Sequence, residues 1–405
     1  MLSYHTSPLA ALGGKHSGGM NVYVRELGVG LGKLGHRVDI FTRGARYEEA
    51  DVAAGVRLVT LPAGPGAEPA KIELAAYIPE FAEAMLEYQR EGPSYDLIHA
   101  HYWMSGLVGA QLKSAWKVPM VLMFHTLGLV KNRITAAGEH ESDERIRGER
   151  RALMAADMVV AATPAEQADL QWLYEVRSDR ICVIPPGVDL QLFHPMDKDA
   201  ARAKLRLPAN ANVVLFVGRI EALKGIDTLI RAAHLIVSEG AREATLRVQV
   251  VGGDVDEELE VMGTEMARLR SLARELGVQD RIEFLGSRRQ RDLPGYYAAA
   301  DVVVMPSYSE SFGMVALEAM ACARPVVASR VGGLAYLVQD GATGFHVQEG
   351  NAEELANRFA DLLSDENLLE QIGAAARRAA EDYSWERTAN EIHALYGKLT
   401  QPAVG

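Results

Sequence analysis

Short runs rich in β-branched residues alternate with amphipathic stretches of helical length along the whole chain, and this alternation restricts the fold more than any other feature. Alternating strands and helices are typical of βαβ units built on a parallel sheet. In the first half, helices are expected at 21–34, 74–89, 144–156 and 164–172. The strands expected between them cover 2–5, 37–42, 56–60, 97–101, 120–125, 158–162 and 181–184. The sequence therefore predicts an α/β protein.

The same rhythm begins again in the second half. Strands are expected at 213–217, 246–251, 282–285, 302–306 and 326–329, and helices at 225–238, 257–276, 293–300, 315–321 and 352–363. A chain of 405 residues is long enough for two or three domains. We expect Rossmann-like, doubly wound domains at 1–190 and 191–383, divided after the rigid turn at 185–189, and a final amphipathic helix and tail at 384–405.

Composition excludes several classes of protein. The chain has 42 Lys+Arg against 54 Asp+Glu, a net charge of −12, which argues against a nucleic-acid-binding surface. No run of about 18 apolar residues occurs, so no membrane span is expected, and the start of the sequence lacks a secretory-signal pattern, so we expect a cytoplasmic protein. The two cysteines share no CxxC spacing and no nearby histidine pattern, so no metal site is expected.

Ligands of open α/β sheets bind beyond the carboxyl ends of the strands, so the loops there are where chemistry is expected. One glycine-rich segment, GLGKLG at 30–35, fits the dinucleotide pattern GxGxxG. That pattern requires a strand before the loop and a helix that opens inside it. Here the glycines come at the end of a helical stretch and lead into a strand, so we interpret 30–35 as a glycine-weakened helix end that binds no ligand.

The segment GGKHSGGM at 13–20 has the context that 30–35 lacks, because it follows the first strand and directly precedes the helix at Asn21. Glycines such as Gly18 and Gly19 let backbone N–H groups approach an anion at a helix N-terminus. The alternative is a surface turn without a ligand. The loop is thus one candidate for a phosphate site.

The segment at 217–225 repeats this arrangement in the second half: a strand, a glycine, then Arg219 and Lys224 near a helix start. Arginine offers a planar bidentate fork and lysine a compact charge, which together suit a diphosphate. A solvated basic loop is the alternative on these residues alone.

The stretch at 304–318 is the most informative. A strand ends at Pro306, and the following loop carries Glu310 before a helix begins at about Gly313. The first N–H groups of that helix would point at an anion. Glu310 could accept hydrogen bonds from a sugar, and Glu318, inside the helix, from ribose hydroxyls. The alternative is a pair of ordinary exposed carboxylates.

Together these motifs resemble the retaining glycosyltransferases of family 4, which have the GT-B fold of two facing Rossmann-like domains. The likeness covers essentially the whole chain, including ESFGMVALE at 310–318, PPGVD at 185–189 and VGG at 331–333. It implies an acceptor site in the first domain, a nucleotide-sugar donor site in the second, and a C-terminal helix that crosses back to the first. The donor contacts that it implies are Gly18, Gly19, Arg219, Lys224, Arg288, Glu310, Ser311, Phe312, Gly313, Met314, Val315 and Glu318.

The first half most resembles the members of this family that transfer N-acetylglucosamine from UDP to inositol 3-phosphate, and bacterial sucrose-phosphate synthases are near relatives. The matching segments are HTSPL at 5–9, GGMNVYV at 18–24, HAHYW at 99–103, HT at 125–126 and VKN at 130–132. The likeness gives acceptor-phosphate roles to Lys71, Tyr102, Thr126 and Arg145, and places Asn21 near the cyclitol or sugar. Two cations and two hydroxyls suit a phosphate dianion. An ordinary charged helix face is the alternative for Lys71 and Arg145.

The resemblance implies transfer of N-acetylglucosamine or glucose from a UDP-sugar to a small phosphorylated hydroxyl acceptor, with retention at the anomeric carbon. The family is thought to use front-face attack, in which the leaving diphosphate helps to take the acceptor proton. Arg219 and Lys224 would stabilise that diphosphate, and His125 and Glu310 would hold the donor sugar; these four are the catalytic candidates. No metal or other cofactor is required, and a homodimer is left open as the assembly.

Other functions remain open on the sequence alone. They include sucrose-phosphate synthase acting on UDP-glucose and fructose 6-phosphate, a lipid or polysaccharide glycosyltransferase, and a UDP-sugar epimerase or phosphorylase on the same fold. A non-enzymatic two-lobed binding protein would normally carry a secretory signal and would not need Arg219, Lys224 and Glu310 together. The sequence also leaves open whether the nucleotide is UDP, ADP or GDP.

Overall fold

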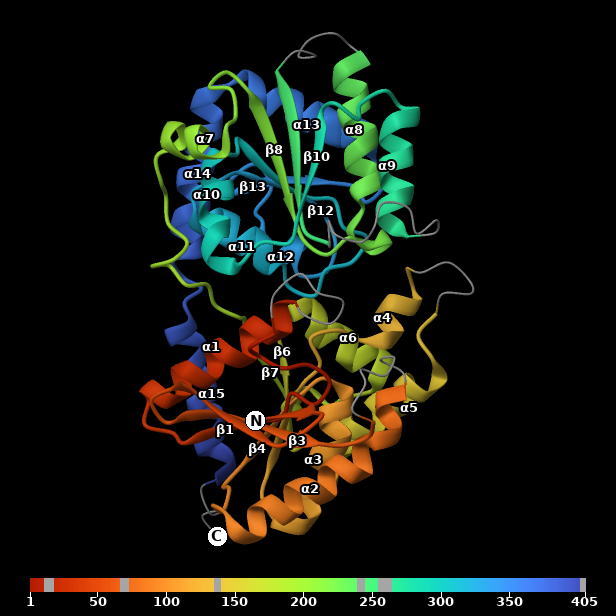
Figure 1. Cartoon of the computed structure of the whole chain (residues 1–405), viewed down its shortest axis with the longest axis vertical. Coiled ribbons are helices and arrows are strands. Elements are labelled where there is room, and N and C mark those ends of the chain that lie inside the picture. The colour runs from red at the N-terminus through yellow and green to blue at the C-terminus, as the bar shows by residue number, and fades with distance from the viewer. Residues whose placement is uncertain (11–17, 66–72, 135–139, 239–244, 254–263, 401–405) are drawn as a thin grey trace. The chain divides into compact units, whose positions relative to one another are not determined.

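The computed structural model describes residues 1–10, 18–65, 73–134, 140–238, 245–253 and 264–400. They form two compact units (Figure 1). Of the described residues, the first unit contains Met1–Ala10, those of Gly19–Gly187, and 385–400, and the second contains Gly18 and those of Val188–Ser384. Each unit is built on its own sheet or sheets, as expected for a chain with two rounds of strand and helix.

The first unit is α/β. Its strands are β1 (Val38–Gly44), β2 (Glu48–Ala53), β3 (Val56–Pro62), β4 (Ile98–His101), β5 (Met120–Met123), β6 (Met158–Ala161) and β7 (Ile181–Val183). Its helices are α1 (Gly19–Lys33), α2 (Ile78–Glu91), α3 (Trp103–Trp116), α4 (Gly128–Asn132), α5 (Asp143–Ala155), α6 (Pro164–Tyr174) and α15 (Trp385–Thr400), with 3-10 turns η1 (Glu73–Tyr77) and η2 (Ser178–Arg180). The strands form two sheets, ordered β1-β3-β2 and β4-β5-β6-β7, and are parallel except for β2.

The strand expected at 2–5 is reduced to one residue, Leu2, which pairs in parallel with Phe41 of β1 and with Ala100 of β4. The chain then turns, because the Ser3 hydroxyl donates a hydrogen bond of 2.7 Å to the carbonyl of Thr6. Leu2 therefore joins the two sheets, and the loops after this segment and after β4 leave from the place where the strand order reverses.

The segment at 30–35 is the end of α1, as expected, and its glycines serve packing. A Cβ at Gly30 would lie 2.7 Å from the Cβ of Ala389 on α15, so only glycine allows this close approach. Helices α1 and α15 lie side by side (Figure 1). The hydroxyl of Tyr396 on α15 also lies 2.6 Å from Nδ1 of His99 on β4. The final helix therefore belongs to the first unit, as the resemblance implied.

The second unit has six strands in one parallel sheet of order β10-β9-β8-β11-β12-β13 within the described residues. They are β8 (Asn212–Val217), β9 (Leu246–Val251), β10 (Ile282–Gly286), β11 (Val302–Met305), β12 (Val326–Ser329) and β13 (Gly344–Val347). Its helices are α7 (Lys198–Leu205), α8 (Ile226–Ser238), α9 (Glu265–Glu275), α10 (Leu293–Ala299), α11 (Met314–Ala321), α12 (Leu334–Leu337), α13 (Ala352–Ser364) and α14 (Glu366–Ala380), with 3-10 turns η3 (Ala222–Lys224) and η4 (Gln290–Asp292).

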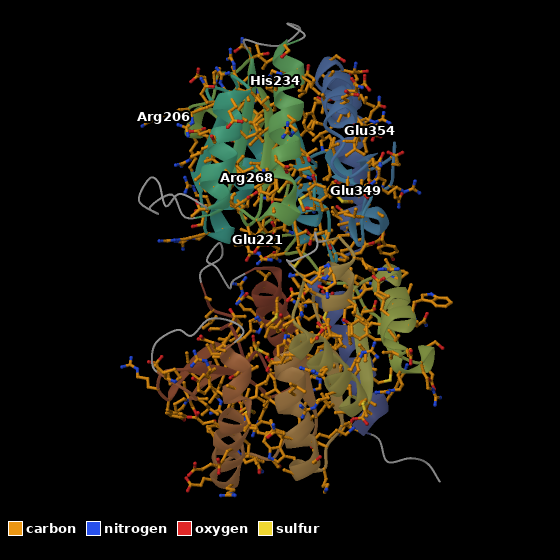
Figure 2. The ribbon with its side chains drawn as sticks, turned by 90° about the vertical axis from the view of Figure 1, so that its right-hand side faces the viewer. Arg206, Glu221, His234, Arg268, Glu349 and Glu354 are labelled. Atoms are coloured by element: carbon orange, nitrogen blue, oxygen red, sulfur yellow. The ribbon has the colours of Figure 1, made fainter. Side chains whose placement is uncertain are left out.

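Helices cover both faces of this sheet. Helices α8 and α9 lie together on one side, and α7, α10 and α14 lie on the other (Figure 1). Figure 2 shows His234 on α8, whose Nδ1 lies 2.8 Å from the carbonyl of Leu276 just after α9. Valine and leucine side chains of β8, β9 and β11 are buried between these layers, which explains their near-continuous apolar sequences.

Several elements were not expected. Helix α3 has few charged residues and contains Gly106 and Gly109, so it shows no polar stripe. The reason is burial: a Cβ at Gly109 would lie 2.5 Å from the sulfur of Met120 on β5. A helix enclosed by its neighbours gives no amphipathic signal. Strands β2 and β13 and helices α7 and α14 also go beyond the expected pattern.

Candidate active site

The strand order of the second unit reverses between β8 and β11, so a ligand crevice is expected beyond the carboxyl ends of these two strands. The loops that follow them pack backbone to backbone. The N–H of Tyr308 donates to the carbonyl of Leu223 at 2.9 Å. Gly225 has φ +65°, and a Cβ there would lie 2.0 Å from the carbonyl oxygen of Pro306. The sequence motifs at 217–225 and 304–318 are thus neighbours.

Lys224 and Glu310 form an ion pair across these two loops. Nζ of Lys224 lies 2.6 Å from Oε2 of Glu310, and each side chain is 17% exposed. Both predicted residues are therefore held in place before any ligand binds. Part-burial strengthens their mutual attraction and their attraction for charged ligand groups.

Gly313 fixes the start of α11. Its φ of +99° lies in the left-handed region, and it caps the helix whose first residues are Met314 and Val315. The loop before it is anchored by the N–H of Gly333, which donates to the carbonyl of Glu310 at 2.9 Å. Phe312 is buried, and Ser311, Met314 and Val315 are half-buried. The first N–H groups of α11 have no acceptor within the helix, which is the arrangement that favours an anion.

Glu318 lies on α11 and is buried, which excludes for this residue the alternative of an ordinary exposed carboxylate. The hydroxyl of Tyr297, on α10, donates to its Oε2 at 2.7 Å, and Nε2 of Gln290 lies 3.4 Å from Oε1. Burial raises the pKa of Glu318 to about 7, against the opposing effect of these hydrogen bonds. Tyr297 and Gln290 are contacts that sequence reasoning missed.

Arg219 and Arg288 lie in other loops of the second unit. Nη1 of Arg219 lies 2.5 Å from Oε1 of Glu221, which Figure 2 labels. Nε of Arg288 donates to the hydroxyl of Tyr296 at 2.8 Å, and its guanidinium carbon lies 5.9 Å from the centre of that ring. The Arg288 side chain is thus held by Tyr296, and its role as a donor contact stays a prediction.

In the first unit, the structure brings together three of the four residues predicted to hold the acceptor phosphate. Nη2 of Arg145, on α5, lies 3.1 Å from Oγ1 of Thr126, which follows β5. The guanidinium carbon of Arg145 lies 5.2 Å from the centre of the Tyr102 ring, after β4. Arg145 is buried, so it is not part of an ordinary exposed helix face. Lys71 and residues 11–17 of the glycine-rich loop lie outside the described residues.

Asn21, on α1, is buried. Its Nδ2 donates to Oγ1 of Thr6 at 2.8 Å and to the carbonyl of Ser7 at 2.6 Å. It therefore shapes the segment that follows the Leu2 bridge. Gly19 opens α1 directly after Gly18, as the glycine-loop prediction requires.

His125 has φ +62°, an uncommon backbone conformation for a residue with a side chain. Its Nε2 lies 3.1 Å from Nδ1 of His101, and its ring meets the Tyr23 ring edge-on at 5.2 Å. Burial lowers the pKa of His125 to about 3, so the ring is neutral. A neutral ring can offer one N–H and one lone pair, but not a positive charge.

His101 and His99 extend this cluster and were not assigned a role from the sequence. Both are buried, and their ring centres lie 4.3 Å apart. Their spacing of two residues in a strand places them on one face, which is the signal that could have found them. Within the described residues, no group of three or more His, Cys, Asp or Glu side chains is arranged to hold a metal ion.

The described helices include none with the length and apolar character needed to cross a membrane. Two family models match the chain. Residues 18–187 match the glycosyl transferase 4-like domain, and residues 197–379 match glycosyl transferases group 1. Apart from Gly18, the described residues of the first range lie in the first unit, and those of the second range lie in the second unit.

Among curated proteins, the chain is 43% identical to D-inositol 3-phosphate glycosyltransferase 2 of Catenulispora acidiphila, over 98% of this chain and 94% of that protein. Among solved structures, it is similar to sucrose-phosphate synthase from Thermosynechococcus elongatus, with a TM-score of 0.89 and 35% identity over 98% of both chains. HepE of Anabaena, solved with UDP and glucose, shares the fold, with a TM-score of 0.76 and 24% identity over 98% of this chain and 99% of that one. The chain therefore belongs to the family 4 glycosyltransferases of the GT-B fold, in the group that includes the D-inositol 3-phosphate glycosyltransferases.

Proposed function

We propose that this glycosyltransferase transfers a sugar from a UDP-sugar to a phosphorylated cyclitol, inositol 3-phosphate. The observation that carries the proposal is the convergence of Arg145, Thr126 and Tyr102 in the first unit. These are three of the positions at which the family resemblance places the acceptor phosphate. The name of the relative that is 43% identical over nearly the full chain supports the same acceptor. The sugar is N-acetylglucosamine, with glucose as the alternative.

The second unit supplies the donor site. The diphosphate binds to Lys224, Arg219 and the first N–H groups of α11. Because Lys224 is paired with Glu310, the diphosphate competes with Glu310 for its ammonium group. Glu310 then accepts hydrogen bonds from the donor sugar, and Glu318 from the ribose. Gly18, Gly19 and His125 remain predictions for the donor, as does Asn21 for the acceptor.

We further propose that transfer retains the anomeric configuration and needs no metal. Fixed cations and helix N–H groups stabilise the charge that develops on the leaving diphosphate, which is the task a divalent ion performs in other transferases. The acceptor hydroxyl attacks from the face that the diphosphate leaves, and a diphosphate oxygen takes its proton. NMR of the product would show an axial anomeric linkage from an α-linked donor, and EDTA would leave the rate unchanged.

The deciding experiment is a panel of UDP-, ADP- and GDP-sugars offered with inositol 3-phosphate, inositol and fructose 6-phosphate. We expect the highest kcat/KM with UDP-N-acetylglucosamine and inositol 3-phosphate, and a phosphorylated product of the combined mass. UDP release at a rate that ignores the acceptor would contradict the proposal.

Sucrose-phosphate synthase is the second candidate, because the structure with a TM-score of 0.89 carries that name. The same panel separates the two, since a synthase would favour UDP-glucose with fructose 6-phosphate. A UDP-sugar epimerase would convert the donor without any acceptor.

A further inference from the structure

Glu149, on α5, is wholly buried. It contacts Arg145 and the loop that carries Thr126, the two residues predicted to bind the acceptor phosphate. Its Oε1 accepts a hydrogen bond from Nε of Arg145 at 2.9 Å. The same carboxylate accepts from the N–H of Gly128 at 3.0 and 3.2 Å, two residues beyond Thr126. The hydroxyl of Tyr174 also donates to it. One carboxylate thus fixes both sides of the contact between Arg145 and Thr126.

The way Arg145 is held determines which of its edges can meet a ligand. Glu149 takes Nε, and Nη2 lies 3.1 Å from both the carbonyl and Oγ1 of Thr126. Nη1 lies 2.5 Å from Oε1 of Glu141, which is 28% exposed, whereas Glu149 is 0% exposed. An incoming phosphate can compete with the part-exposed Glu141 at Nη1, while the buried contact at Nε keeps the plane of the guanidinium fixed.

The surrounding backbone is built for this contact. A Cβ at Gly128 would lie 2.6 Å from Cδ1 of Ile146, 3.1 Å from Oε2 of Glu149 and 3.2 Å from Nε of Arg145, so a larger residue would displace Ile146 and crowd the pair. The hydroxyl of Tyr174, on α6, accepts from the N–H of Leu129 at 3.0 Å while donating to Glu149. The first N–H groups of α4 are thereby satisfied by Glu149 and Tyr174. A buried carboxylate that accepts hydrogen bonds from this many donors is held in one orientation.

We propose that Glu149 is a positioning residue for acceptor-phosphate recognition, which it achieves by orienting Arg145 and the loop that carries Thr126. The proposal rests on the acceptor-phosphate site proposed above. Glu149 touches no substrate itself. Tyr174 is a second positioning residue, because its hydroxyl bonds Oε2 of Glu149 whereas Nε of Arg145 bonds Oε1.

The test compares Glu149→Gln, Tyr174→Phe and Arg145→Lys in the full-length enzyme, with inositol 3-phosphate and inositol as acceptors. We expect Glu149→Gln to raise KM for inositol 3-phosphate about ten-fold and to lower the preference for the phosphorylated acceptor by a similar factor. Tyr174→Phe also raises KM for inositol 3-phosphate and lowers the preference for the phosphorylated acceptor, by a smaller factor. Glu144→Gln, an exposed position on the same helix, is the matched control and leaves both unchanged.

Two results would overturn the inference separately from the proposed function. If Arg145→Lys lowers the preference for the phosphorylated acceptor but Glu149→Gln and Tyr174→Phe do not, the acceptor site stands and the positioning role fails. Equal losses with both acceptors in the Glu149 variant would assign it a purely structural role. If Arg145→Lys leaves the preference intact, the acceptor site itself is wrong and the positioning role falls with it. Should Glu149→Gln not fold, Tyr174→Phe carries the comparison.

Discussion

The ammonium of Lys224 lies 2.6 Å from a carboxylate oxygen of Glu310, although 86 residues separate them in the chain. They meet because β8 and β11 are neighbours at the point where the strand order reverses. A cation and a carboxylate are thus placed side by side where open sheets bind ligands.

Replacing Lys224 by alanine should lower kcat by a factor on the order of 10² to 10³, because it removes a fixed charge from the leaving diphosphate. Steady-state kinetics with saturating donor measures the loss. Lys204→Ala, an exposed position on α7 of the same unit, is the control and should match the wild type. If Lys224→Ala keeps its turnover while remaining folded, the diphosphate assignment is wrong.

Comparing alanine substitutions at Gly225 and Gly277 measures the energetic cost of steric crowding in the loop at 217–225. Both have positive φ, +65° and +71°, but a Cβ at Gly225 would meet Pro306 whereas a Cβ at Gly277 would meet nothing within 4 Å. Alanine should cost about 1–2 kcal/mol of unfolding free energy at Gly277 from φ alone. At Gly225 the loop must also shift, adding about 1–3 kcal/mol and lowering donor affinity. Urea unfolding measures the difference; equal costs at the two positions would contradict the close packing of the loops.

The two loops of the candidate site in the second unit could be predicted from the sequence because their signals are local. A strand followed by Gly218, Arg219 and Lys224, and a second followed by Glu310 and Gly313, each identify a loop without knowledge of its neighbours. Parallel strands place such loops at one edge of the sheet, so their convergence follows from the fold class. The strand order in the structure brings the two motifs together as this reasoning requires.

The partners of these residues could not be predicted, because they depend on tertiary packing. Nothing local indicates that Tyr297 bonds Glu318, or that the carboxylate of Glu149 also accepts from the N–H of Gly128. The strand at 2–5 was overestimated for a different, local reason: the Ser3 hydroxyl donates to the carbonyl of Thr6 and closes a turn where the extended segment was expected to continue.

Acid should destabilise the first unit through its buried histidines. Burial lowers the pKa of His125 to about 3, and lowers those of His99 and His101 well below 6.5. The folded state therefore binds fewer protons than the unfolded state below pH 6.5. The contribution of these histidines to stability is complete above pH 6.5 and falls by about 1 kcal/mol per histidine for each pH unit below it.

His101→Gln removes one of these groups and should flatten the fall in Tm between pH 6.5 and 5.5, whereas His140→Gln, an exposed control, should not. Thermal unfolding followed by circular dichroism across this range measures the slopes. A His101 variant whose Tm falls as steeply as that of the wild type would show that this ring does not contribute to acid sensitivity.

Glu318 should give the second unit the opposite pH dependence. Burial raises its pKa from 4.5 to about 7, so the folded state holds a proton that the unfolded state releases. Its contribution to stability is complete below pH 4.5 and is lost as pH rises through 7, by about 3 kcal/mol in all. Glu318→Gln keeps a neutral group that can accept from Tyr297, so the wild type should lose stability relative to this variant between pH 4.5 and 7.5. Urea unfolding at several pH values measures the difference, with Glu283→Gln, an exposed position on β10, as the control. Parallel stability curves for the wild type and Glu318→Gln would contradict the raised pKa, because they would mean that the Glu318 carboxyl group is ionised across this range in the folded protein.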